Sequence, residues 1–468
     1  MPGAILPGRP GNLTPDQQVK LQELWSASLR VFGFAAPTNG VNGVDSLTEA
    51  DEKLKSSANG SEKQPKKKRV SLFGKKHRSD EAENGAMDGF GDSDDKYGQT
   101  KEFQSVLANQ SPEDLRKAFW SMVKHDHPDG LLLRFLRARK WDVQKALIMM
   151  VATMHWRLQE MHVDDDIITR GEGGALSDSA SSNAAVKKEG ADFIAQLKLG
   201  KSFLHGTDKE GRPMCFVRAR LHKQGEQSEA SVERCTVFVI ETARLMLSPP
   251  VDTAAIVFDM TDFSIANMDY APVKFMIKVF EANYPESLGV VLVHKSPWLF
   301  HGIWSIIKGW LDPVVASKVH FTKNVEELEL FVERSHIIKE LGGDDPYTYE
   351  YTQPRPGEND QMSDTATKER LLDERAAIVK EFEQVTLEWI KEPQVAEQRR
   401  GELAERLRSG YWQLDPYIRA RSLYDRTGVI RNGGQIQHYD PPKLGVTTTV
   451  SAQNGSIPPL QHSQDDID

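Results

Sequence analysis

Residues 289–294 read GVVLVH, an unbroken apolar run of strand length, and residues 318–322 read KVHFT. Between the two runs, residues 296–311 read SPWLFHGIWSIIKGWL, which is long enough for a helix. A strand, a helix and a second strand in this order form a βαβ unit, whose two strands lie parallel in one sheet. This stretch therefore predicts an α/β fold.

The same alternation extends toward the N-terminus. Strands are predicted at residues 213–219, 254–259, 289–294 and 318–322. Helices are predicted at residues 231–247, 268–284, 298–311 and 325–334. Strands separated by helices of this length predict a mainly parallel sheet with right-handed crossovers.

The N-terminal part of the chain has helical character. Thr14-Pro15 and Ser111-Pro112 are helix-start signals, because each places a capping side chain before a proline at the first helical position. Residues 131–161 predict two helices, the second capped by Asp142. Residues 164–183 contain clusters of Gly and Ser and are expected to form a loop.

Residues 39–110 contain few large apolar side chains, so we expect them to be disordered. Their charges are sorted into blocks: residues 63–78 hold eight Lys and Arg and no acid, and residues 79–95 hold seven acids and no base. The segment is thus expected to interrupt the helical region as an insertion.

The C-terminal region predicts two further helices. Leu371, Ile378, Phe382, Val385 and Trp389 form one apolar stripe at helical spacing. A second, charged helix is predicted at residues 394–408, followed by an aromatic run over 411–424. Residues 441–468 are expected to be disordered.

Composition excludes several classes of protein. The 468 residues include 68 acids against 59 Lys and Arg, a net charge of -9 that argues against a mainly nucleic-acid-binding protein. Two cysteines exclude a disulfide framework or a Cys-rich zinc site. No apolar run reaches the roughly 18 residues of a membrane span, and the first residues lack the features of a secretory signal. We expect a cytoplasmic protein, soluble or peripherally attached to intracellular membranes.

The sequence contains no catalytic signature. There is no G-x-S-x-G elbow, no P-loop and no H-E-x-x-H motif, and the 13 histidines show no metal-ligand spacing. The glycine-rich residues 171–174 follow a helix rather than a strand, so they do not indicate a nucleotide site. No catalytic residue, cofactor or metal is predicted, and the protein is not expected to be an enzyme.

The predicted helix within residues 296–311 is apolar on nearly all its faces, and Lys308 is its only charged residue. A helix of this kind needs cover on every side, from the protein core, a membrane or an apolar ligand. The pattern alone leaves these three possibilities open.

Several spaced motifs resemble the CRAL-TRIO lipid-binding family. They are LLRFLRARKWDVQ at residues 132–144, TDKEGRP at 207–213, NYPE at 283–286 with Gly289, and LDPVVASK at 311–318. LPGRPGNL at residues 6–13 resembles the N-terminus of fungal phosphatidylinositol-transfer proteins. LDPYIRARS at residues 414–422 resembles fungal members with an additional helical tail.

The resemblance implies a CRAL-TRIO fold, with a helical N-terminal lobe, a mostly parallel sheet that floors a lipid pocket, and a helical C-terminal extension. The implied divisions are 1–38 (N-terminal helix), 39–110 (disordered insertion), 111–192 (helical lobe and loop), 193–353 (lipid-binding domain), 354–440 (helical extension) and 441–468 (disordered tail). The aromatic helix matches the family's gate over residues 297–311. The implied gate residues are Trp298, Phe300, Ile303, Trp304, Ile307 and Trp310.

The family's inositol-phosphate site carries over in part, onto Arg139, Glu286 and Lys318. Arg and Lys can pair with phosphate, and Glu can accept from an inositol hydroxyl. Two neighbours differ, because an arginine that commonly follows the acid is Ser287 here and a threonine before the lysine is Val315.

The phosphatidylcholine site of the family departs further. Members that bind this lipid use two tyrosines, a serine and a threonine, and the matching positions are Leu204, Cys215, Ala254 and Ile256. A choline phosphate there would lose its hydrogen bonds, at ~1–3 kcal/mol for each unsatisfied group. The resemblance thus implies phosphatidylinositol binding with reduced phosphatidylcholine binding, and a second ligand that is more apolar, such as a sterol-pathway hydrocarbon.

Two functions are carried forward. The first is a soluble protein that exchanges phosphatidylinositol between membranes; the alternative is a lipid-sensing scaffold that acts on a protein partner through its tail and disordered segment. The expected partners are the phospholipid ligand and, transiently, membrane surfaces, with no nucleic acid. The tail is expected to clamp the lipid domain, and a homodimer surface is the alternative. PKKKR at residues 65–69 resembles a nuclear-import signal, with a membrane tether and a plain linker as alternatives.

Overall fold

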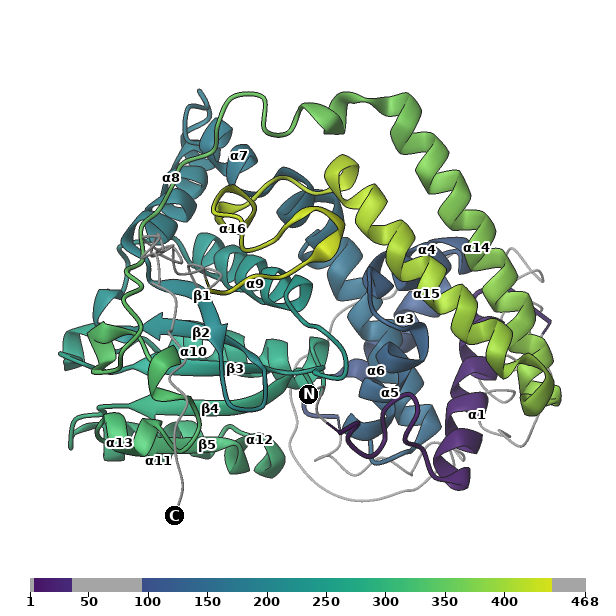
Figure 1. The fold of residues 1–468 in the computed structure, drawn as a ribbon, viewed down its shortest axis with the longest axis horizontal. Helices are drawn as coiled ribbons and strands as arrows, with labels where there is room; N and C mark the ends of the chain where they lie inside the picture. Colours follow the sequence, from purple (N-terminus) through teal and green to yellow (C-terminus); the bar gives the residue numbers. More distant parts are fainter. Residues whose placement is uncertain (1–3, 36–94, 440–468) are drawn as a thin grey trace, which may run out of the picture. The chain divides into compact units, whose positions relative to one another are not determined.

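The predicted sheet is present, with one strand more than expected (Figure 1). In a computed structural model that describes residues 4–35 and 95–439, the strands pair in the order β1-β2-β3-β4-β5. They are β1 (Ser202–Thr207), β2 (Pro213–Arg218), β3 (Ala254–Asp259), β4 (Leu288–His294) and β5 (Val319–Thr322). β1 is antiparallel to β2 and every other neighbouring pair is parallel, which confirms a mainly parallel sheet.

The sequence of β1, SFLHGT, lacks the unbroken apolar run that identifies the other strands. Its polar residue His205 is nevertheless buried, with Nε2 2.7 Å from Asp345 Oδ2. A buried polar side chain is tolerated when it is hydrogen-bonded, and this pairing depends on a residue 140 positions away. The strand was therefore not predictable from local pattern.

The two faces of the sheet carry different clusters of side chains, because successive residues of a strand point to opposite sides. Leu204, Cys215 and Ile256 face a cluster that includes residues of the helices α8 to α11. Phe203 and Phe216 face the opposite cluster, which is covered by residues 325–349. Figure 1 shows α8 and α9 on one side of the sheet.

The lobe that contains the sheet also contains nine α-helices and π-helical turns with assigned bounds among the described residues. They are η2 (Val163–Ile168), α7 (Thr169–Asp178), α8 (Ala184–Leu199), α9 (Glu229–Leu245), α10 (Tyr270–Lys278), η5 (Val279–Asn283), α11 (Phe300–Lys308), α12 (Pro313–Ser317) and α13 (Val325–Leu328). Short 3₁₀ turns are η3 (Ala219–Leu221), η4 (Ile265–Asn267), η6 (Arg334–His336), η7 (Lys339–Leu341), η8 (Asp360–Ser363) and η9 (Asn432–Gly434).

The prediction of a loop at residues 164–183 is wrong, because η2 and α7 occupy most of this segment. Ile167, Ile168 and Ala175 are buried, so the helices present an apolar side to the core. Gly171 has a φ of 47° inside α7 and marks a kink between helical turns. The glycines indicated a bend in a helix rather than an irregular loop.

Two predicted helices are shorter than expected. α13 ends at Leu328, although helix was predicted to residue 334, and α11 covers Phe300–Lys308 within the predicted 298–311. The backbone after α11 turns at Gly309 and leads to Asp312, whose side chain accepts from the Val314 N–H at 2.7 Å and starts α12.

The N-terminal lobe is helical, as predicted. Its helices are α1 (Pro15–Val31), α3 (Gln99–Asn109), α4 (Pro112–Val123), α5 (Pro128–Ala138), α6 (Val143–His155) and the π-helical turn η1 (Trp156–Glu160). Thr14, Ser111 and Asp142 each accept a hydrogen bond from the first turn of the following helix, which confirms the predicted caps.

The disordered insertion was predicted to end at residue 110. This boundary is too far along the chain, because α3 lies inside residues 39–110. Phe103 and Val106 of α3 are buried in the core of the N-terminal lobe. The sequence did not predict this short amphipathic helix, because the long polar segment before it dominated the local composition. The basic block, the import-like residues 65–69 and all but Asp95 of the acidic block lie outside the described residues, as does the segment 441–468.

The C-terminal extension packs into the N-terminal lobe. Its helices are α14 (Thr365–Lys391), α15 (Pro393–Ile418) and α16 (Leu423–Arg426). Figure 1 shows α14 and α15 side by side near α1, and Phe382 and Leu403 belong to the same buried cluster as Trp25. Arg400 pairs with Asp129 of α5 at 2.6 and 2.9 Å, so the lobe and the extension share one core.

The apolar stripe predicted for α14 is confirmed, but α15 continues ten residues past its predicted end at 408. Tyr411 and Leu414 prolong the buried face begun by Leu403 and Leu407, and this spacing was visible in the aromatic run. The described residues up to His438 form a single compact unit.

Candidate functional site

A mostly apolar cavity of about 250 Å³ lies on the α8 to α11 side of the sheet. Its floor includes Ile256 and Phe258 of β3 and Val291 and Val293 of β4. Side chains of α9, α10 and α11 form the remaining walls. A larger cavity, about 1040 Å³, lies in the C-terminal extension, but its lining is rich in charged groups such as Arg421 that already pair with carboxylates. The apolar cavity is therefore the candidate site.

The aromatic helix α11 closes one side of this cavity. Phe300, Trp304 and Ile307 line it, and Ile303 packs beside them. Trp298, just before the helix, is 84% exposed and Ile306 is 48% exposed. α11 is thus buried on one side and presents an apolar surface on the other. Its apolar sequence had predicted that all its sides would be covered. Among the described helices none is both long and apolar enough to cross a bilayer.

The C-terminal end of this aromatic segment is anchored. The indole of Trp310 packs edge-on against Tyr270 at 5.3 Å, with Lys274 4.9 Å from its ring. The backbone N–H of Asp312 donates to Glu281 at 2.7 Å. The second carboxylate oxygen of Glu281 accepts a hydrogen bond from the Lys96 ammonium at 2.8 Å.

The anchor includes residues that precede α3. The Tyr97 hydroxyl donates to Glu281 at 2.6 Å, and the Lys96 ammonium also donates to the Trp310 carbonyl at 2.5 Å. Burial, and then its hydrogen bond to Glu281, raise the pKa of Tyr97 well above its ordinary range. The end of the predicted insertion thereby bridges η5 to the segment after α11, an arrangement for which the sequence gave no signal.

Three of the four positions implied to exclude phosphatidylcholine lie together on the cavity side of the sheet. Leu204 pairs with Cys215, and Cys215 pairs with Ile256, across three neighbouring strands. Ala254 is two residues before Ile256, at the start of β3, where the pairing with β4 is irregular. Of these four positions, Ile256 lines the cavity. Burial raises the pKa of the Cys215 thiol to about 12, so the thiol is neutral at physiological pH.

A side chain from the C-terminal extension reaches the same patch. The Leu204 N–H donates to the hydroxyl oxygen of Tyr424 at 2.6 Å, and Tyr424 is buried in the same cluster as Leu204 and Cys215. Tyr424 is held by its neighbours, since Leu423 N–H donates to the buried Glu172 at 2.8 Å. The extension therefore occupies space beside the first two strands.

Two of the three implied headgroup residues lie near the amino-terminal ends of β4 and β5, and the third lies at the end of α5. Arg139 ends α5, Glu286 precedes β4 by two residues, and Lys318 ends α12 directly before β5. All three are partly exposed. The Val291 N–H of β4 donates to the Lys318 carbonyl at 2.9 Å, and Glu286 has a φ of 54°, so local backbone geometry fixes both positions. Glu286 and Lys318 thus lie before neighbouring parallel strands, and none of the three residues is part of the cavity lining.

Neighbouring hydrogen bonds tie Arg139 and Glu286 to the core. The Arg139 guanidinium donates to Gln99 at 2.8 Å, and Gln99 donates to the Ala282 carbonyl at 3.2 Å. Arg134, one and a half turns before Arg139, donates to the Glu286 carbonyl at 2.8 Å and lies 3.5 Å from the Ser287 hydroxyl. The Arg134 guanidinium therefore lies beside Ser287, the position at which the family commonly has an arginine. Sequence reasoning did not identify Arg134 for this place.

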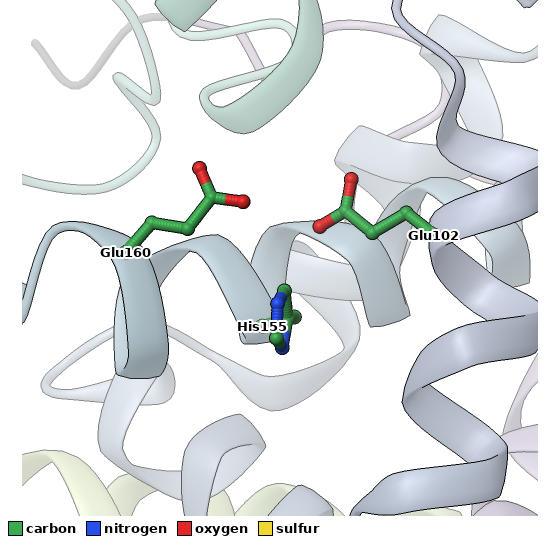
Figure 2. Close-up of side chains that lie close together, drawn as sticks. All are labelled: Glu102, His155 and Glu160. Atoms are coloured by element: carbon green, nitrogen blue, oxygen red, sulfur yellow. The ribbon is translucent and has the colours of Figure 1, made fainter.

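One cluster of potential metal ligands occurs among the described residues (Figure 2). Glu102 of α3 and His155 of α6 approach Glu160 of η1, with one potential ligand atom from each within 4.8 Å of the others. His155 Nδ1 lies 2.6 Å from the side-chain nitrogen of Gln110, and Glu160 is exposed. Burial, and then the charge of Glu160, raise the pKa of Glu102 to about 7. Burial and the charge of Glu160 account for that pKa, and the proximity of the three groups does not establish a metal site.

Family comparisons agree with this geometry. Residues 99–152 match the model of the CRAL/TRIO N-terminal domain, and residues 197–343 match that of the CRAL/TRIO domain. A CRAL-TRIO domain-containing protein of Schizosaccharomyces pombe is 44% identical over 430 residues, which cover 90% of this chain and 92% of the relative. The chain belongs to the CRAL-TRIO family.

A second CRAL-TRIO relative is similar over nearly its whole length. The phosphatidylinositol transfer protein CSR1 of Eremothecium gossypii is 39% identical over 451 residues, 91% of this chain and 98% of the relative. The solved structure of Sfh5 aligns with 57% of this chain and 94% of its own, with 15% identity and a TM-score of 0.38. The two CRAL-TRIO family models do not extend into α14, α15 and α16, so the packing of these helices is described by this structure rather than by the family match.

Proposed function

We propose that this CRAL-TRIO protein binds phosphatidylinositol in the apolar cavity under α11 and exchanges it between membranes, with reduced phosphatidylcholine binding. The observation that carries the proposal is the cavity itself, apolar and bounded by the sheet and an aromatic helix. Similarity to a relative named as a phosphatidylinositol transfer protein supports the choice of ligand. Binding and exchange need no covalent chemistry.

The size of the cavity indicates how exchange would proceed. About 250 Å³ is below the ~300–1,000 Å³ of ordinary ligand pockets, so two acyl chains require α11 to move away from the sheet. Leaving two chains of about 15 carbons in water would cost roughly 20 kcal/mol, at ~0.8 kcal/mol per CH₂. The exposed Trp298 and Ile306 give the displaced helix apolar groups that can enter a membrane surface.

The headgroup is assigned to Arg139, Glu286 and Lys318. The two cations would pair with the inositol-linked phosphate, and the Glu286 carboxylate would accept from ring hydroxyls. The location of Glu286 and Lys318 near the starts of the neighbouring strands β4 and β5 supports this assignment. Arg134 would hold the Glu286 backbone in place through its 2.8 Å hydrogen bond.

Weak binding of phosphatidylcholine follows from the patch around Cys215. Leu204 and Ile256 offer no side-chain hydrogen bond to a choline phosphate, and the ring of Tyr424 is buried in the same cluster. A buried phosphate without partners would lose ~1–3 kcal/mol for each missing hydrogen bond. The bound lipids of the purified protein, identified by mass spectrometry, should contain phosphatidylinositol and little phosphatidylcholine. Abundant phosphatidylcholine would refute this part of the proposal.

Transfer of phosphatidylinositol between liposomes tests the headgroup assignment. Lys318→Ala should reduce the transfer rate at least tenfold, because a charge-assisted hydrogen bond contributes ~1.5–3 kcal/mol. Lys323→Ala is the matched control, since Lys323 is exposed just beyond the other end of β5. Equal transfer by both variants would contradict the assignment. Tight binding with very slow exchange by the unmodified protein would instead favour the lipid-presentation scaffold.

A further inference from the structure

Lys201 is a buried cation in the wall of the apolar cavity. It lies between Gly200, which ends α8, and the first residue of β1. Its side chain is 9% exposed. Arg218, a second cation of the cavity wall, pairs closely with Glu340, whereas the acids near Lys201, Glu226 and Asp192, make no hydrogen bond to it.

The hydrogen-bonding capacity of Lys201 is only partly used. An ammonium has three N–H donors, and one of them reaches the side-chain oxygen of Gln227, an uncharged acceptor. Glu226 is the nearest carboxylate among the described residues, at 3.9 Å, and it is 45% exposed, so water screens its charge. Burial lowers the pKa of Lys201, as expected for an ammonium that is poorly compensated.

Lys201 lies at the opposite end of the sheet from the implied headgroup residues. The Arg218 N–H, at the carboxyl end of β2, donates to the Lys201 carbonyl at 2.8 Å. Glu286 and Lys318 precede β4 and β5, and β2 to β5 are mutually parallel. Lys201 therefore lies in the cavity wall near the carboxyl ends of the parallel strands, whereas Glu286 and Lys318 lie near their amino ends and outside the cavity lining.

We propose that Lys201 binds the carboxylate of a single-chain fatty acid whose hydrocarbon tail occupies the apolar cavity. A ligand carboxylate would give the buried ammonium a charged acceptor at hydrogen-bond distance, which Glu226 at 3.9 Å does not provide. A cavity of about 250 Å³ suits one chain rather than two. This second ligand goes beyond the exchange of phosphatidylinositol and differs from the uncharged hydrocarbon suggested by the sequence.

Binding of cis-parinaric acid, a fluorescent single-chain fatty acid, to the full chain tests this proposal. Oleate should displace the probe at concentrations at least tenfold lower than methyl oleate or oleyl alcohol, because neither of these can form the ion pair. Lys201→Met should lose at least tenfold in oleate affinity and keep its affinity for methyl oleate. Lys201→Arg should stay within a few-fold of the unmodified protein, since the charge is retained.

Lys198→Met is the matched control, because Lys198 is exposed on α8 three residues before Lys201. Retained methyl oleate binding shows that Lys201→Met is folded with its cavity intact. Equal affinity of the unmodified protein for oleate and methyl oleate would overturn the proposal, and so would unchanged oleate affinity in Lys201→Met. Phosphatidylinositol transfer is measured separately, so its absence with oleate binding intact would refute the proposed transfer function and leave this inference standing.

Discussion

At the scale of single residues, buried charges hold the two lobes together. Glu241 of α9 is fully buried and accepts from Arg157 at 2.7 Å and from the Tyr284 hydroxyl at 2.6 Å. Its other oxygen contacts Lys124, which ends α4. Burial alone would raise the pKa of Glu241, but the charges of Arg157, Lys124 and Arg244 outweigh it and hold that pKa well below its ordinary range. One carboxylate thus joins the helical lobe to the sheet lobe.

Glu241→Gln should lower the free energy of unfolding by about 3–5 kcal/mol, because it leaves buried cations without their partner. A carboxylate with a lowered pKa stabilises the fold above its unfolded-state pKa of about 4.3, and this contribution is lost as the pH falls. Urea unfolding from pH 5 down to pH 2 should therefore show a smaller loss of stability in the variant. The exposed Glu229→Gln on the same helix is the control, with a change within ~0.5 kcal/mol.

Glu102 has the opposite pH dependence. Its pKa of about 7 means that the folded state retains a proton that the unfolded chain releases near pH 4.3, so stability falls as the pH rises between these values. Glu160, Asp95, Lys278 and His155 face this carboxyl group and remain in the variant.

Glu102→Gln should stabilise the protein by about 1 kcal/mol at pH 8, after allowance for solvent at this half-buried site, and have no effect at pH 4. Thermal unfolding at the two pH values measures the difference. A gain of the same size at both pH values would show that the effect does not arise from titration of Glu102.

At the scale of elements, the segment from α11 to α12 is held at its end. The Glu281 carboxylate accepts hydrogen bonds from Lys96, Tyr97 and the Asp312 N–H, and its side chain is 7% exposed. α11 itself has an exposed side, so fewer contacts hold its middle. The freedom of α11 to move away from the cavity therefore depends on this anchor.

Glu281→Gln should increase amide hydrogen exchange in residues 300–317 about tenfold, because charge-assisted bonds worth ~1–2 kcal/mol are weakened. Exchange followed by mass spectrometry measures this effect in the full chain. Lys101→Met serves as the control, since Lys101 is exposed on α3. Unchanged exchange in Glu281→Gln would show that the anchor does not restrain α11.

Elements were predictable where the chain carries a strong local pattern. Four strands, the caps at Thr14, Ser111 and Asp142, and the stripe on α14 were all recoverable from periodicity and capping chemistry. β1 and α3 were missed, because each depends on distant partners for its buried polar or apolar groups. The position of Tyr424 beside Leu204 and the burial of Lys201 in the cavity wall could not be predicted from the sequence, since both follow from tertiary packing.

At the scale of the whole molecule, the extension completes the core of the N-terminal lobe. Phe382 is fully buried, with its ring 5.6 Å from Trp25 and 5.7 Å from Trp120. Glu383, the next residue, pairs with Arg116 through two contacts of 2.7 Å. The lobe and the extension should therefore unfold in one transition.

Phe382→Ala should destabilise the chain by about 3–5 kcal/mol, as expected for truncation of a buried aromatic ring. Tryptophan fluorescence and circular dichroism should still report coincident transitions in urea. Leu372→Ala, 40% exposed on the same helix, is the control and should change stability by less than ~1 kcal/mol. Separate transitions for the two probes would show that the extension folds independently.

The shared core also constrains how the chain matures on the ribosome. Trp25 is synthesised 357 residues before Phe382, and at ~5–20 residues per second the interval is roughly 20–70 s. During that time the apolar surface of α1 and α4 has no α14 or α15 to cover it, so we expect nascent chains to depend on chaperones. A premature stop codon anywhere before α15 would leave this surface permanently open and direct the product to degradation.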